Sequence, residues 1–150
     1  MKTLYFDIDG TVLLLHEDEV KECLAEGRLE DAIRRTRFEK LVCVGNFAAI
    51  AHAVKGVDPT YDGLSILFDL CQGAFADLAW FRSVTTLVKD PERRAEHIDF
   101  GADWWYVDDL ASKYLLAADK EAVMAQEPRR ICTPQPNGDG QDIIDWLLAA

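Results

Sequence analysis

The sequence lacks the features that mark several large classes of protein. No basic segment followed by an apolar one stands at its N-terminus, and no run of about 18 apolar residues occurs, so we expect neither a signal peptide nor a membrane span. Basic residues are few, 16 against 27 acidic ones, and the net charge of −11 disfavours nucleic acids and anionic membranes as partners. The four cysteines lie far apart and form no C-x-x-C pair, so neither a zinc site nor a disulfide framework is expected. We therefore expect a cytoplasmic protein.

What the sequence does contain is an alternation of short apolar strands and amphipathic helices. The 150 residues are 49% hydrophobic, enough for one domain with a core, which we place at residues 1–150. Five apolar segments are predicted as strands: residues 4–6, 41–44, 83–88, 104–107 and 130–133. Helices between the strands predict an α/β fold, a three-layer sandwich around a mostly parallel five-stranded sheet. Within this domain, residues 16–38 are expected to form a small helical insert.

The first strand runs directly into the segment Asp7-Ile8-Asp9-Gly10-Thr11. Residues two apart in a strand point to the same side, so the carboxylates of Asp7 and Asp9 are expected to lie together where the strand ends. Gly10 lets the backbone turn sharply, and Thr11 can cap the turn or bind an anion. Two unpaired carboxylates repel one another unless a cation or a shared proton intervenes, and Mg²⁺ is a cation that takes oxygen ligands.

A second acidic pair, Asp108 and Asp109, follows the aromatic strand over residues 104–107. Ligands of parallel α/β sheets lie beyond the carboxyl ends of the strands. We therefore expect the acids after the first and fourth predicted strands to meet at one site, although about 100 positions separate them in the sequence. Asp109 also suits a helix N-terminus, where the helix dipole stabilises an acid.

Together these motifs resemble those of the haloacid dehalogenase-like (HAD) superfamily, in its phosphatase branch. The resemblance implies a Rossmann-like fold in which Asp7 is a nucleophile that forms an aspartyl-phosphate and Asp9 is a general acid and base. It also implies a Mg²⁺ cofactor, bound by Asp7, by Asp9 through its backbone carbonyl, by Asp108 and by Asp109.

The second motif of the family departs from its usual form in this sequence. Gly45 stands where a Ser or Thr is expected to hold the phosphoryl group, and backbone N–H groups or the Asn46 amide would have to take its place. The predicted phosphate contacts are therefore Gly10, Thr11, Gly45 and Asn46. Asn46 equally suits the N-cap of a helix over residues 47–54.

The third motif is a lysine that neutralises the nucleophile and the phosphoryl group, and Lys89 matches it best. Its competitors are Arg82, Arg93 and Arg94. The family usually carries a cap domain over its site, but the segments between the predicted strands are too short for a large one.

These observations predict a Mg²⁺-dependent phosphatase that hydrolyses a phosphate monoester through an aspartyl-phosphate. The alternative is a catalytically weakened phosphate-binding or regulatory module on the same fold, with Gly45 marking lost catalysis. A receiver-like signalling domain fits the order of the first motif poorly, because its phospho-acceptor ends a later strand. The expected partner is a phosphorylated substrate, and the aromatic-rich segment 64–81 suggests a possible homodimer.

Overall fold

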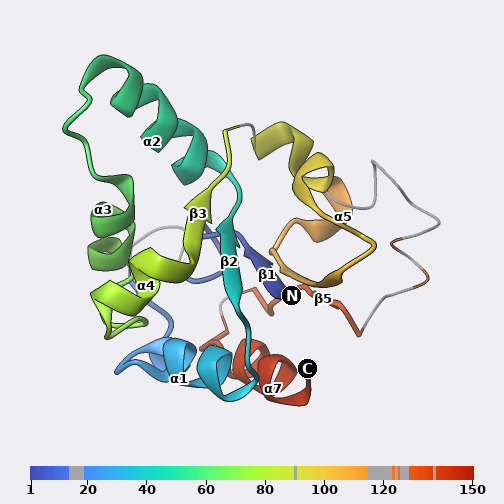
Figure 1. Cartoon of the computed structure of the whole chain (residues 1–150). Coiled ribbons are helices and arrows are strands. Elements are labelled where there is room, and N and C mark those ends of the chain that lie inside the picture. The colour runs from blue at the N-terminus through green and yellow to red at the C-terminus, as the bar shows by residue number, and fades with distance from the viewer. Residues whose placement is uncertain (14–18, 90, 115–122, 124, 126–128, 137) are drawn as a thin grey trace.

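The computed structural model describes residues 1–13, 19–89, 91–114, 123, 125, 129–136 and 138–150. Its centre is a sheet in the strand order β3-β2-β1-β4-β5, in which every neighbouring pair is parallel (Figure 1). The strands are β1 (Lys2–Phe6), β2 (Lys40–Cys43), β3 (Thr85–Leu87), β4 (Asp103–Val107) and β5 (Ile131–Cys132). This confirms the predicted α/β class with its five-stranded parallel sheet. Among the described residues, no helix combines the length and the apolar character that crossing a membrane requires.

The helices cover both faces of the sheet, as a three-layer sandwich demands. The cluster on one face includes buried side chains of α1 (Arg28–Arg35), α3 (Gly63–Leu70), α4 (Leu78–Val84) and α7 (Gln141–Ala149), and α1 and α7 lie side by side (Figure 1). The cluster on the other face includes side chains of the 3-10 helix η2 (Pro91–His97) and of α5 (Ala111–Tyr114). The helix α2 (Asn46–Val57) leaves the carboxyl end of β2 and contacts α3, β3 and η2. A short 3-10 helix, η1 (Glu22–Leu24), contacts α1 and α7.

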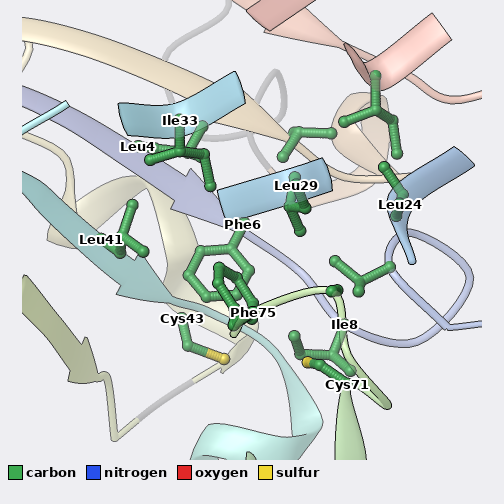
Figure 2. Close-up of a cluster of buried hydrophobic side chains, with 14 of the residues drawn as sticks. Leu4, Phe6, Ile8, Leu24, Leu29, Ile33, Leu41, Cys43, Cys71 and Phe75 are labelled. Carbon is green, nitrogen blue, oxygen red and sulfur yellow. The ribbon is translucent and has the colours of Figure 1, made fainter. Parts of the chain in front are cut away.

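The main core forms where alternate residues of the strands face the α1 and α7 side. Phe6 of β1 packs there against Phe75 with ring centroids 6.4 Å apart, and Phe75 in turn packs against Phe81 at 4.7 Å. Figure 2 shows Phe6 and Phe75 among the aliphatic side chains of the same cluster, with Leu29 and Ile33 supplied by α1. Residues 16–38, predicted as an insert, thus contribute a helix to the core of the domain. Residues 16–18 of this region lie outside the described residues.

The boundaries of several elements differ from the prediction. The strand predicted over residues 83–88 is limited to Thr85–Leu87, because Ser83 and Val84 form the last turn of α4. The apolar segment 64–81 divides into α3 and α4, with Gly73 in the turn between them at φ 92°. After Asp109, which was expected to suit a helix N-terminus, the structure describes the short helix α5, and residues 115–118 lie outside the described part of the chain.

Candidate functional site

Asp7 and Asp108 occupy matching positions at the carboxyl ends of the two central strands. Phe6 is in register with Val107, and the N–H of Asp7, the next residue along, donates to the carbonyl of Val107 at 3.1 Å. The chain connections run outward from β1 to β2 and β3 on one side, and to β4 and β5 on the other. The boundary between β1 and β4 is therefore the switch point of the topology, where parallel α/β sheets bind their ligands.

Three carboxylates converge at this switch point. Asp7, Asp108 and Asp109 each offer an oxygen within 4.8 Å of the others. The side chains of Asp7 and Asp108 are buried, and Asp109 is half-buried. The structure thus brings together three of the four acids predicted to share a site, from strands far apart in the sequence. Oxygen ligands at this spacing suit a hard divalent cation.

The convergence of these carboxylates leaves the site short of positive charge. Burial, followed by the nearby charge of Asp108, raises the pKa of Asp7 to about 8, against the opposing effect of Arg94. Burial and then Asp108 also raise the pKa of Asp109. Three ionised carboxylates paired with one guanidinium would carry a net charge of −2, and a divalent cation offsets that charge.

Arg94 is the guanidinium at this site. Its side chain is buried, forms an ion pair with Asp108 and lies 3.8 Å from Asp7 Oδ1 through Nη2. Arg94 belongs to η2, which is anchored against the sheet by its buried neighbour Ala95 and by Ile98 just beyond it. The packing of η2 therefore places the guanidinium of Arg94 next to the carboxyl ends of β1 and β4.

Asp108 is held by two hydrogen bonds in addition to its ion pair with Arg94. The hydroxyl of Tyr106 donates to Asp108 Oδ2 at 2.6 Å, and the N–H of Leu110 donates to Oδ1 at 2.8 Å. Tyr106 and Asp108 are two residues apart at the end of β4, so their side chains project to the same side. Burial and the charge of Asp108 raise the pKa of Tyr106, which keeps the phenol a hydrogen-bond donor. We did not predict a role for Tyr106, although its spacing from Asp108 was a usable signal.

Two glycines make close approaches that admit no side chain. A β-carbon on Gly45, whose φ is 104°, would fall within 2.3 Å of Asp7 Oδ1 and 3.1 Å from Arg94 Nη2. A β-carbon on Gly10 would fall 2.3 Å from Asp109 Oδ2. The absence of a hydroxyl at residue 45 therefore has a local cause: the backbone of Gly45 packs directly on the acid cluster.

Thr11 links the segment that follows β1 to the segment that follows β4. Its side chain is fully buried, and its Oγ1 accepts a hydrogen bond from the N–H of Asp109 at 3.1 Å. The carbonyl of Ile8 accepts from the N–H groups of Thr11 and Leu13, which closes the turn that follows Asp7. The predicted phosphate contact Thr11 thus fixes the relative positions of Asp7 and Asp109.

Three predicted site residues are exposed and are neither among the three clustered carboxylates nor the guanidinium that pairs with them. Asp9 is exposed, and its side chain is not one of the three clustered carboxylates. Lys89 is exposed and forms no ion pair with a described residue. Asn46 is exposed as the first residue of α2, and the N-cap position falls on Gly45, without a capping side chain.

The fold and the cluster together define a doubly wound α/β protein with an acidic centre at its topological switch point. Comparisons of the chain with protein-family models, with curated proteins and with solved structures found no match. Membership of the superfamily that the two acidic motifs resemble stays a prediction.

Proposed function

We propose that the protein is a Mg²⁺-dependent phosphatase that hydrolyses a phosphate monoester through an aspartyl-phosphate on Asp7. The observation that carries this proposal is the convergence of Asp7, Asp108 and Asp109 at the switch point of the sheet. A nucleophilic carboxylate and a phosphate dianion repel one another, so such chemistry needs positive charge beside the nucleophile. The cluster supplies the ligands for that charge.

Mg²⁺ fits the donor set of this site. Asp7, Asp108 and Asp109 offer carboxylate oxygens, the ligands that Mg²⁺ prefers. Burial first, and then the charge of Asp108, raises the pKa of both Asp7 and Asp109, and a bound cation would oppose both effects. These three residues would hold the ion, together with the backbone carbonyl of Asp9 that the resemblance implies. The bound ion would act as a Lewis acid and offset the charge of the phosphoryl oxygens.

The protein's own groups then divide the reaction into two steps. In the first, a carboxylate oxygen of Asp7 attacks phosphorus, the bond to the substrate oxygen breaks, and Asp9 donates a proton to the leaving alkoxide. In the second, Asp9 takes a proton from water, the resulting hydroxide attacks phosphorus, and inorganic phosphate leaves with Asp7 restored. The exposure of Asp9 is compatible with this exchange of protons with substrate and water.

Arg94 is better placed than Lys89 to neutralise the phosphoryl group. Its guanidinium lies 3.8 Å from Asp7 Oδ1, too far for a short hydrogen bond and near enough to reach an oxygen of a phosphoryl group transferred to Asp7. A guanidinium can bind two phosphoryl oxygens at once, which suits the charge that spreads over them during transfer. Backbone N–H groups near Gly45 would complete the contacts to phosphate.

The test is release of phosphate from an aryl phosphate, with and without Mg²⁺. We expect turnover in the parent protein only with the metal, and none in Asp7→Asn. Asp31→Asn is the control, because Asp31 is exposed on α1 and forms an i,i+4 pair with Arg35. If Asp7→Asn turns over as fast as Asp31→Asn, the proposal is wrong.

The alternative is a phosphate-binding or regulatory module with little or no turnover. Two observations favour it: residue 45 carries no hydroxyl, and the predicted catalytic Lys89 is exposed without an ion pair to a described residue. Phosphate binding to the Mg²⁺-loaded protein, combined with no release from aryl phosphate, would select this alternative over the enzyme.

A further inference from the structure

The carboxylate of Asp108 is closed off by the groups that pack on it. Asp108 has no exposed surface, so an ion can reach its carboxylate only after one of those groups moves aside. Asp7 is also buried, with 6% of its surface exposed. The acids that would bind Mg²⁺ are therefore shielded from an ion in this conformation of the protein.

The hydrogen bonds of Asp108 leave little capacity for a metal. Each carboxylate oxygen has about two lone-pair sites. At Oδ2 one is taken by the hydroxyl of Tyr106, at 2.6 Å, and the other by Nη1 of Arg94. At Oδ1 one is taken by the N–H of Leu110, at 2.8 Å. A metal can bind through Oδ2 only if Tyr106 or Arg94 withdraws.

Tyr106 and Leu110 are held in place by the backbone. Tyr106 is fully buried in β4, which is hydrogen-bonded to β1 on one side and to β5 on the other. The donor of Leu110 is itself a backbone N–H, and the N–H of Asp109 before it is bonded to Thr11 Oγ1. Neither donor can leave Asp108 without disturbing the sheet or the turn that follows it.

Arg94 is the donor that can withdraw. Its guanidinium stands at the end of a long side chain with several staggered rotamers, and it comes from η2 rather than from the sheet. η2 is a 3-10 helix of seven residues, longer than the run of about three or four that its hydrogen-bond geometry usually sustains. The buried anchors Ala95 and Ile98 both follow Arg94 in the chain. The guanidinium can therefore leave Asp108 while β1 and β4 stay in place.

We propose that Arg94 is the counter-ion of Asp108 in the metal-free protein and that it leaves Asp108 when Mg²⁺ binds. This inference rests on the metal site of the proposed function and does not depend on turnover. Arg94 and the ion compete for one carboxylate. The released guanidinium stays beside Asp7, whose Oδ1 is 3.8 Å from Nη2, and becomes free to bind a phosphoryl oxygen there. Arg94 thus keeps the site closed until the metal is in place.

The first test is calorimetric titration of the full chain with MgCl₂ in the absence of phosphate. Only molecules in which Arg94 has withdrawn bind the ion, so the measured dissociation constant is the intrinsic one divided by their fraction. Arg94→Gln removes the competitor. It should bind Mg²⁺ at least about tenfold more tightly than the parent protein, the contribution of one hydrogen bond to a charged group.

Lys89→Gln is the control for the loss of a positive charge alone. Lys89 is exposed and forms no ion pair with a described residue. Its substitution should change the affinity for Mg²⁺ by less than about threefold, because salt screens exposed charges.

A second test follows Arg94 in the parent protein, since Arg94→Gln removes a buried ion pair and is expected to lose stability. NMR of isotope-labelled arginine side chains measures how fast the guanidinium protons exchange with water, and the Arg94 signals are assigned by their absence in Arg94→Lys. Burial and pairing with Asp108 protect these protons in the metal-free protein. Saturating Mg²⁺ should make their exchange at least about tenfold faster, because the same pair is broken.

The outcomes separate this inference from the proposed function. If the parent binds Mg²⁺ while Arg94→Gln binds it no more tightly than Lys89→Gln, the inference is wrong although the metal site stands. The same holds if the Arg94 protons stay equally protected at saturating Mg²⁺. If neither the parent nor Arg94→Gln binds Mg²⁺, the metal site is wrong and the inference falls with it.

Discussion

Gly45 and Asp7 lie so close together that a β-carbon on residue 45 would fall 2.3 Å from Oδ1 of Asp7. The backbone of Gly45 also has φ at 104°, a conformation that other residues adopt only under strain. Asp7, the candidate nucleophile, can therefore occupy its position only because residue 45 has no side chain. This relationship between a backbone and a carboxylate leads to the first prediction.

Gly45→Ser should fail to restore the hydroxyl that the resembled family carries, and should impair the protein instead. We expect a loss of about 1–3 kcal/mol in the free energy of unfolding from backbone strain, and roughly 100-fold lower turnover from displacement of Asp7. Gly56→Ala is the control, because Gly56 lies in α2 with no heavy atom within 4 Å of an added β-carbon. It should gain about 0.5–1 kcal/mol. Urea unfolding and phosphate release measure both effects, and a more active Gly45→Ser would refute the geometric reading.

Arg94 and Lys89 are competing candidates for the cation of the site, and substitution separates them. Arg94→Gln removes the guanidinium that pairs with buried Asp108, so we expect unfolding free energy to fall by about 3–5 kcal/mol. Lys89→Gln removes an exposed charge and should change stability by less than about 0.5 kcal/mol. Arg94→Lys keeps the charge and should retain more stability than Arg94→Gln while losing turnover. Loss of turnover in Lys89→Gln with full turnover in Arg94→Lys would assign the role to Lys89.

Tyr106→Phe should weaken the metal site although it replaces none of the proposed metal ligands. The lost hydroxyl donates to Asp108, and such supporting bonds typically change metal affinity by roughly 10–100-fold. Tyr5→Phe is a matched control on the neighbouring strand, since Tyr5 is in register with Tyr106 but its hydroxyl accepts from the N–H of Asp99. Calorimetric titration with Mg²⁺ compares the two variants. Equal Mg²⁺ affinity in both variants would show that the hydroxyl of Tyr106 does not support the metal site.

The stability gained from Mg²⁺ should grow with pH. The folded-state pKa of Asp7, about 8, lies above its unfolded value, so the stability that its protonation contributes is complete below about pH 4. That contribution is lost as pH rises through about 8, when the buried carboxylate ionises beside two others. A divalent cation opposes the loss, and the shift in melting temperature caused by Mg²⁺ should be larger near pH 9 than near pH 5.

The control for this pH dependence is Asp7→Asn, whose residue 7 does not titrate. Without metal, the melting temperature of this variant should fall less between about pH 5 and pH 9 than that of the parent protein. The reason is that residue 7 of the variant has no proton to lose over this range. A Mg²⁺ shift that is equal at both pH values in the parent protein would contradict the assignment of Asp7 to the site.

Local patterns were enough to predict most of the fold and half of the candidate site. The acids at positions 7, 108 and 109 could be placed together because parallel strands end at one edge of a sheet, and both strands are marked by apolar residues directly before the acids. The predicted strands and their parallel order followed from the same kind of local signal. The extent of β3 did not, because the β-branched residues 84–86 suit a strand, while Ser83 and Val84 form the last turn of α4, whose Phe81 is packed in the core.

The order of the elements, the parallel sheet and the three strand-end carboxylates can all be inferred from local patterns, because periodicity and turn residues lie within a few positions of one another. The contact of Arg94 rather than Lys89 with the acids, the support of Asp108 by Tyr106 and the position of Asp9 outside the cluster follow from the three-dimensional fold alone. These contacts depend on how η2 packs on the sheet through Ala95 and Ile98, and such packing joins residues that share no local pattern.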